Sequence, residues 1–180
     1  MAIYVYGATA QAKMTIDLLE RLDIAVEGCI DKSLLLDSVL GYYVELNHQY
    51  DSEANYVLAI RNAGLRKRTF EDLSLRNFPV LVDPDAYVSK HTEVEAGTVI
   101  FAKAVLMPDV QIGQQVLIDS GAVIHSNTII EDFVNIGANV HIGSNVLVGE
   151  GVEIGANSVV DNEVTLAPFT IIPPNSHISG

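Results

Sequence analysis

Hydrophobic positions in residues 82–178 recur with a period of six. Steps of six from Val82 reach only Ile, Leu or Val as far as Ile178, and the register never shifts. The residue four places after each of these positions is small or β-branched, as at Ala86 and Val110. A fixed period held over this length predicts a repeat fold, in which each repeat stacks on the next.

A period of six is typical of a parallel β-helix built from hexapeptide repeats. Six residues supply a short strand and a corner, three repeats complete one coil, and the aliphatic side chains stack inside. Gly and Asn, as in Gly137 and Asn139, often fall between the aliphatic positions. Both tolerate the positive φ that tight corners need. We therefore expect residues 81–180 to form a β-helix domain of about five coils.

Residues 1–80 follow a different pattern. Short apolar runs at 3–6, 26–30 and 56–60 alternate with helical patterns at 10–22 and 63–76. Strands that alternate with helices predict a parallel sheet, so we expect residues 1–80 to form a separate α/β domain. Ligands of such sheets bind at the carboxyl ends of the strands. Here those ends carry Gly7-Ala8-Thr9, Asp31-Lys32 and Arg61-Asn62.

The charge is acidic and uneven. The 180 residues carry a formal net charge of −13. Eight basic residues face eleven acidic ones in 1–80, whereas two face twelve in 81–180, and Lys103 is the last basic residue. An acidic surface repels phosphate backbones and anionic lipid, so the composition argues against nucleic-acid and membrane partners.

The remaining composition points to a soluble cytoplasmic protein. The N-terminus lacks the basic and long apolar segments of a signal peptide, and no run approaches the ~18 apolar residues of a membrane helix. The single cysteine, Cys29, excludes an internal disulfide framework and a cysteine-based zinc site.

Five segments resemble motifs of a bacterial enzyme family. They are Gly-Ala-Thr-Ala-Gln-Ala-Lys at 7–13, Gly-Cys-Ile-Asp-Lys at 28–32, Ala-Ile-Arg-Asn at 59–62, the junction 80–86 and the coil 121–136. Together with the domain order and the repeat, they make the chain similar to acetyltransferases that modify nucleotide-linked amino sugars. The resemblance covers essentially the whole chain. It implies a Rossmann-like N-terminal domain, a left-handed β-helix and a homotrimer.

The resemblance also implies the substrates. It predicts transfer from acetyl-CoA to a nucleotide-linked amino sugar in bacterial glycan biosynthesis. Cationic side chains suit a diphosphate, and a carboxylate suits a hydroxyl or a base. The expected substrate residues lie in the resembling motifs at the strand ends: Gly7, Ala8, Thr9, Gln11, Lys13, Asp31, Lys32, Arg61 and Asn62. Donor binding is expected along the later coils, at Gly143, Ser144 and Ala156, through backbone amides. Because these coils lack cations, Lys103 of a neighbouring subunit is the expected partner of the adenine phosphates.

The coil 121–136 differs from the family's motif at the catalytic positions. In the family a histidine acts as general base beside a carboxylate; here those positions are Ser126 and Asn127. Two further family histidines are replaced by Asn135 and Gln11. A serine hydroxyl is no base near neutral pH, whereas imidazole is.

His125 precedes the family's catalytic position by one residue, and His141 lies one coil above on the same face. Ser126, His125 and His141 are therefore the candidate catalytic residues. Two solvated surface histidines are the alternative interpretation. No third ligand has suitable spacing for zinc, so we expect no metal.

Two functions remain open from the sequence. The first is the acetyltransferase, favoured by the domain order and by Asp31 and Asn62. The second is a non-catalytic homologue that keeps the fold and serves as a sugar-binding or partner subunit. The lost histidines and absent cations favour the second.

We also expect a solvated helix face at 66–68 and exposed apolar walls on the β-helix, carrying Val105, Leu117, Val123, Ile129 and Leu147.

Overall fold

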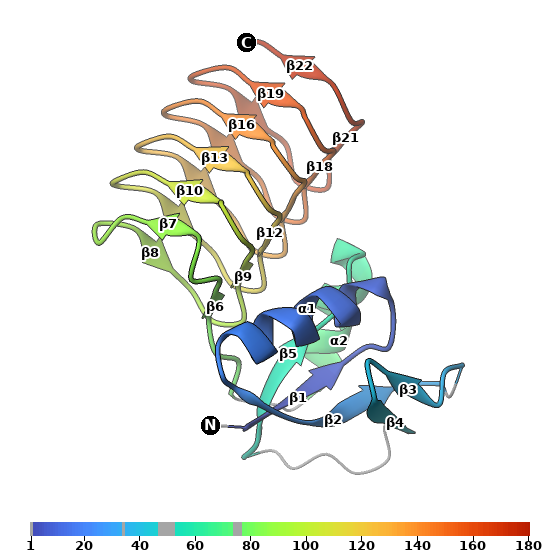
Figure 1. The fold of residues 1–180 in the computed structure, drawn as a ribbon. Helices are drawn as coiled ribbons and strands as arrows, with labels where there is room; N and C mark the ends of the chain where they lie inside the picture. The colour runs from blue at the N-terminus through green and yellow to red at the C-terminus, as the bar shows by residue number, and fades with distance from the viewer. Residues whose placement is uncertain (1, 34, 47–52, 74–76) are drawn as a thin grey trace. The chain divides into compact units, whose positions relative to one another are not determined.

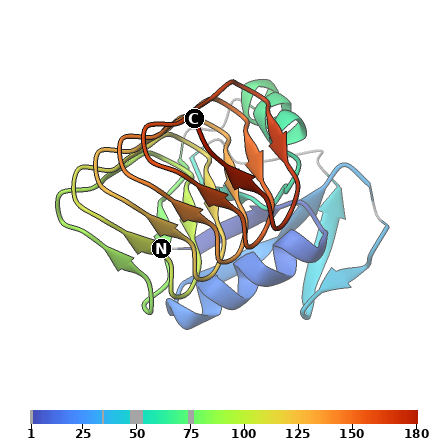
Figure 2. The same cartoon turned by 90° about the horizontal axis from the view of Figure 1, so that it is seen from above.

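The computed structural model describes residues 2–33, 35–46, 53–73 and 77–180. The chain separates into two compact units, Met1–Leu81 and Val82–Gly180. Each unit has its own architecture (Figures 1 and 2).

The first unit is an α/β sheet with a helix on each face (Figures 1 and 2). Its strand order is β3-β4-β2-β1-β5, and its elements are β1 (Ala2–Tyr6), α1 (Ala10–Arg21), β2 (Ala25–Asp31), β3 (Ser38–Val39), β4 (Tyr42–Leu46), β5 (Asn55–Leu58) and α2 (Ala63–Asp72). All neighbouring strands are parallel except β3, which pairs antiparallel with β4. The expected strands and helices are present, and the β3–β4 hairpin was not predicted. Within the described residues, no helix combines the length and apolarity needed to cross a membrane.

The prediction of a solvated helix face at 66–68 is wrong for Arg66. This side chain is 0% exposed. Its Nη1 donates to the carbonyls of Ile60, at 2.7 Å, and Arg61, at 3.1 Å. The guanidinium therefore holds the chain where β5 leads into α2. The predicted helix end at 74–76 lies outside the described residues.

The second unit is a parallel β-solenoid, as the six-residue period predicts. Its coils stack so that each repeats the outline of its neighbour (Figure 2). Three sheets run along it, in the orders β21-β18-β15-β12-β9-β6, β22-β19-β16-β13-β10-β7 and β20-β17-β14-β11-β8. The strands are β6 (Leu81–Val82), β7 (Tyr87–Val88), β8 (Glu93–Val94), β9 (Val99–Ile100), β10 (Val105–Leu106), β11 (Gln111–Ile112), β12 (Leu117–Ile118), β13 (Val123–Ile124), β14 (Ile129–Ile130), β15 (Asn135–Ile136), β16 (His141–Ile142), β17 (Leu147–Val148), β18 (Glu153–Ile154), β19 (Val159–Val160), β20 (Thr165–Leu166), β21 (Ile171–Ile172) and β22 (His177–Ile178).

The periodic aliphatic residues form the core of the solenoid. Each one is the second residue of its two-residue strand, from Val82 in β6 to Ile178 in β22. Neighbouring coils pair in register eighteen residues apart, as Ile118 does with Ile136 and Ile136 with Ile154. The predicted hexapeptide register is therefore confirmed. The hand of the winding stays a prediction.

The corners carry positive φ at every sixth residue from Gly97 to Asn175. Gly and Asn occupy many of these positions, as expected, but Lys103, Phe133 and Phe169 also adopt this conformation. Strand pairing on both sides fixes the corner, so the repeat holds even residues that disfavour positive φ.

The expected apolar walls are only partly present. Leu117 is 1% exposed, and its column neighbours Val99 and Asn135 are also buried. The prediction of an exposed Leu117 is therefore wrong. Ile129, by contrast, is 42% exposed.

Candidate functional site

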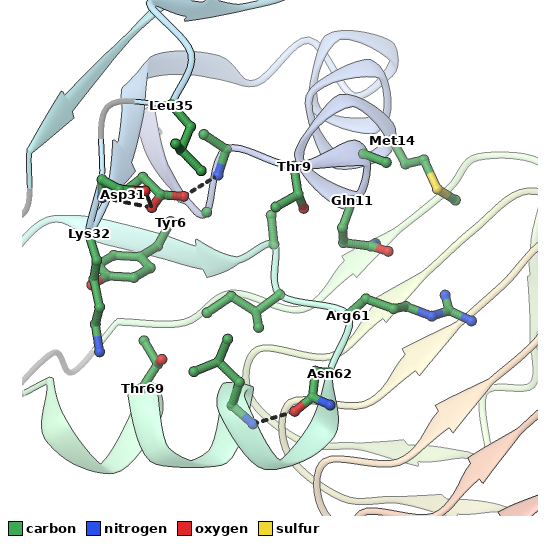
Figure 3. Close-up of a pocket in the computed structure, with 17 residues that line it drawn as sticks. Tyr6, Thr9, Gln11, Met14, Asp31, Lys32, Leu35, Arg61, Asn62 and Thr69 are labelled. Carbon is green, nitrogen blue, oxygen red and sulfur yellow. Dashed lines mark hydrogen bonds between the residues drawn. The ribbon is translucent and has the colours of Figure 1, made fainter.

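A cavity of about 730 Å³ opens in the first unit at the carboxyl ends of β1, β2 and β5 (Figure 3). Every substrate residue expected from the sequence lines it except Lys13, which is exposed on α1. The sequence did not identify the remaining lining residues, which are Tyr6, Ala10, Met14, Ser33, Leu35, Ala59, Ile60, Leu65 and Thr69. The structure thus brings together three loops that the strand pattern placed at one edge of the sheet.

Gly7 shapes the first of these loops. Its φ is +110°, and its N–H donates to the Ile30 carbonyl at 2.7 Å. An added Cβ would lie 2.8 Å from the carbonyl oxygen of Ala59. The backbone directly after β5 therefore passes too close to Gly7 for any side chain at that position.

Replacing Gly7 with Ala is expected to destabilise the first unit by about 2 kcal/mol, because it adds a strained φ and a backbone clash. Urea unfolding measures the loss. Gly28→Ala is the matched control, since its Cβ would meet only the Tyr4 ring at an ordinary 3.8 Å. Equal stabilities of the two variants would contradict the close approach at Gly7.

Asp31 ties two loops of the cavity together (Figure 3). Its Oδ2 accepts the Ala8 N–H at 2.8 Å, and its Oδ1 accepts the N–H and hydroxyl of Ser33 at 3.0 and 3.4 Å. The carboxylate therefore positions the β1–α1 loop against the end of β2. Its place at a strand end was predictable from the sequence, whereas its hold on Ala8 was not.

Asn62 and Arg61 lie on the third loop. The Asn62 side chain accepts the Leu65 N–H at 2.8 Å and caps α2, so this residue has a structural role in the site. Arg61 and Lys32 are exposed at the rim. The interior differs from the rim, since Gln11 and Thr69 are uncharged and buried.

The candidate catalytic histidines lie in the second unit. His125 follows β13, and His141 begins β16, which pairs directly with β13. Their rings are in contact, with centroids 4.7 Å apart and planes inclined at 51°. The structure therefore brings together the two histidines that the coil spacing placed on one face. Ser126 is half-buried beside them.

A hollow of about 450 Å³ adjoins His141. It is lined by His141, Gly143, Val159, Val160, Asp161 and Asn162. Asp161 also contacts His177, with Oδ1 and Nε2 2.9 Å apart, a pair that the sequence did not indicate. Of the expected donor residues, Gly143 lines this hollow, whereas Ser144 and Ala156 do not.

The corner at Gly143 is held firmly. Thr128 donates its hydroxyl to the Gly143 carbonyl at 2.8 Å and accepts the Val146 N–H at 3.2 Å. The Ser144 N–H donates to Asn162 Oδ1 at 2.8 Å. That amide is therefore already engaged within the solenoid, which weakens its expected role in holding the donor.

Two other chemistries find little support among the described residues. The described residues contain no group of three or more His, Cys, Asp or Glu side chains that could hold a metal ion. Cys29 lies in β2, and burial raises the pKa of its thiol to about 11. The thiol is therefore protonated at neutral pH, which makes it a poor nucleophile.

Residues 127–162 match the family described as bacterial transferase hexapeptide (six repeats). A mutant of perosamine N-acetyltransferase from Caulobacter crescentus, in complex with CoA and GDP-perosamine, has a TM-score of 0.92 and 22% identity over 99% of this chain and 89% of that one. The acetyltransferase domain of PglB from Neisseria gonorrhoeae, in complex with acetyl coenzyme A, has a TM-score of 0.72 and 23% identity over 99% and 96%. WeeI from Acinetobacter baumannii has a TM-score of 0.73 and 16% identity over 100% and 97%.

No curated protein sequence matches the chain. What the chain shares with known proteins is therefore the hexapeptide repeat and the architecture. The chain carries the hexapeptide repeats of bacterial transferases within the fold of these solved structures.

Proposed function

We propose that this protein transfers the acetyl group of acetyl-CoA to the amino group of a nucleotide-linked sugar in bacterial glycan biosynthesis. The observation that carries the proposal is the likeness to perosamine N-acetyltransferase, which extends over 99% of the chain and so includes both units. That enzyme was solved with CoA and GDP-perosamine. The cavity and the histidine pair supply sites of the required chemistry.

The nucleotide part of the acceptor is assigned to the cavity of the first unit, a Rossmann-like domain. Gly7, Ala8 and Thr9 lead into α1, whose N-terminus favours anions. Lys32 and Arg61 at the rim offer positive charge to a diphosphate. Lys13 is exposed outside this lining and is not assigned a contact.

Acetyl transfer is assigned to the face of the solenoid that carries His125. The amine nitrogen attacks the thioester carbonyl carbon, and the C–S bond breaks as the tetrahedral intermediate collapses. His125 accepts the proton that the nitrogen releases, and the CoA thiolate leaves and is protonated. The contact with His141 orients the His125 ring.

The donor has few cations available in this chain. Lys90 and Lys103 are the only Lys or Arg residues of the solenoid, and both are exposed. We assign the adenine phosphates of acetyl-CoA to Lys103 of a neighbouring subunit, and the pantetheine arm to the hollow at Gly143. The left-handed winding and a cytoplasmic location belong to the same proposal.

The second candidate is a non-catalytic homologue, favoured by Ser126 at the family's base position. Calorimetric titration with acetyl-CoA separates the two functions. The acetyltransferase requires saturable binding of acetyl-CoA. An absence of binding, with nucleotide-sugar binding intact, would favour the non-catalytic subunit.

The same proposal includes a homotrimer. Exposed apolar side chains on the solenoid, including Tyr87, Ile129 and Val159, would be covered in such an assembly. Ile129→Glu should dissociate the trimer, because it places a charge in an apolar interface. Light scattering at micromolar concentration measures the mass, and a stable wild-type monomer would contradict the trimer.

A further inference from the structure

Two buried polar side chains line the cavity. Gln11 is 4% exposed and Thr69 is 1% exposed. Gln11 Nε2 and Thr69 Oγ1 have no hydrogen-bond partner among the residues that the structure describes. A buried polar atom without a partner costs stability, so such atoms call for a functional explanation.

Both side chains line the same cavity from different elements. Figure 3 shows Gln11 directed into the cavity from the start of α1, and Thr69 from α2. A ligand in the cavity would supply the missing partners. Because an amide nitrogen only donates, the ligand must present an acceptor to Gln11.

The cavity interior favours an uncharged ligand group. Lys32 and Arg61 are exposed at the rim, and Asp31 already accepts hydrogen bonds from Ala8 and Ser33. A phosphate placed beside Gln11 and Thr69 would lose its hydration, and neither basic side chain that lines the cavity is buried.

The walls favour a flat ring over a sugar. Apolar side chains, among them Ile60, Leu65 and Leu35, line the same cavity. Each hydroxyl of a sugar would need its own partner there, whereas a nucleobase presents apolar faces and concentrates its polar atoms at one edge.

We propose that Gln11 and Thr69 determine which nucleotide the cavity accepts, by hydrogen bonding the carbonyl-bearing edge of the base. The inference rests on the proposed nucleotide-linked substrate. Gln11 Nε2 donates to a ring carbonyl, and the Thr69 hydroxyl pairs with the neighbouring ring atom. Uracil and guanine carry such a carbonyl beside an N–H, whereas adenine carries none.

Calorimetric titration with UDP, GDP and ADP tests the proposal on the purified full chain. Wild type should bind UDP or GDP about tenfold more tightly than ADP, because adenine presents an amino group, itself a donor, where uracil and guanine present a carbonyl oxygen to the Gln11 amide. Thr69→Val and Gln11→Leu should each weaken binding of the preferred nucleotide about tenfold and bring its affinity close to that of ADP. Thr69→Ser retains the hydroxyl and should retain the preference.

Thr15→Val is the matched control. Thr15 is also buried, but its hydroxyl donates to the Gln11 carbonyl at 3.0 Å within α1. This variant should keep the nucleotide preference and melt at a lower temperature. Without ligand, Thr69→Val should melt no lower than wild type, since it removes only an unpaired hydroxyl.

Four results would overturn the inference. Equal affinity of wild type for all three nucleotides, an unchanged preference in both variants, or a lower melting temperature for Thr69→Val would overturn it and leave the proposed function standing. Wild type that binds none of the nucleotides would overturn the inference together with the assignment of the cavity to a nucleotide.

Discussion

Ile136→Asp is expected to unfold the middle of the solenoid. Ile136 is fully buried in β15, and it pairs with Ile118 and Ile154 on the coils to either side. An aspartate there loses the aliphatic packing and buries a carboxyl group without a partner, at a cost of at least about 4 kcal/mol. Because each coil is stabilised only by its neighbours, the damage should spread in both directions.

Circular dichroism during thermal unfolding measures this effect. Ile171→Asp is the matched control, because Ile171 lies on the outward side of β21 and is exposed. It should unfold close to wild type. A cooperative transition of Ile136→Asp at the wild-type temperature would show that the interior register is wrong.

His125→Ala is expected to lower kcat by roughly 10²–10⁴-fold, the usual contribution of a general base. KM should change little, because the imidazole is needed for proton transfer and not for binding. Asp132 is a poor substitute base, since its two carboxylate oxygens already accept hydrogen bonds from Gln114 at 2.9 and 3.0 Å. Steady-state kinetics with acetyl-CoA and a nucleotide-linked amino sugar measure both constants.

His177→Ala is the control for removing an imidazole from the same sheet, and it should retain turnover.

The double change Ser126→His with Asn127→Glu restores the family's base and carboxylate, so it should raise kcat. Wild-type turnover in His125→Ala would eliminate this histidine as the base.

The sequence predicts the solenoid well because one short period sets strand, corner and core together. Counting in sixes from Val82 to Ile178 identifies the aliphatic residues that point into the solenoid. The burial of Leu117 was not predictable in this way, because the period fixes the direction of a side chain and not its exposure.

The site of the first unit was predictable only in part. Gly7, Asp31 and Arg61 could be predicted as site residues because they follow strands of a parallel sheet, where such sheets bind their ligands. Thr69 gave no signal, because it directly follows the basic run 66–68, for which the sequence suggested a solvated helix face. Burial of Arg66 on that helix depends on carbonyls at 60 and 61 that no local pattern reveals.

The most direct test of the proposed function is the transfer reaction itself. Purified protein is incubated with acetyl-CoA and a panel of nucleotide-linked amino sugars, and both free CoA thiol and acetylated sugar are quantified. The proposal predicts equal amounts of thiol and N-acetylated product with at least one acceptor, and a large loss of both in His125→Ala. If no acceptor yields acetylated product, although the protein binds the nucleotide sugar, the acetyltransferase assignment is contradicted.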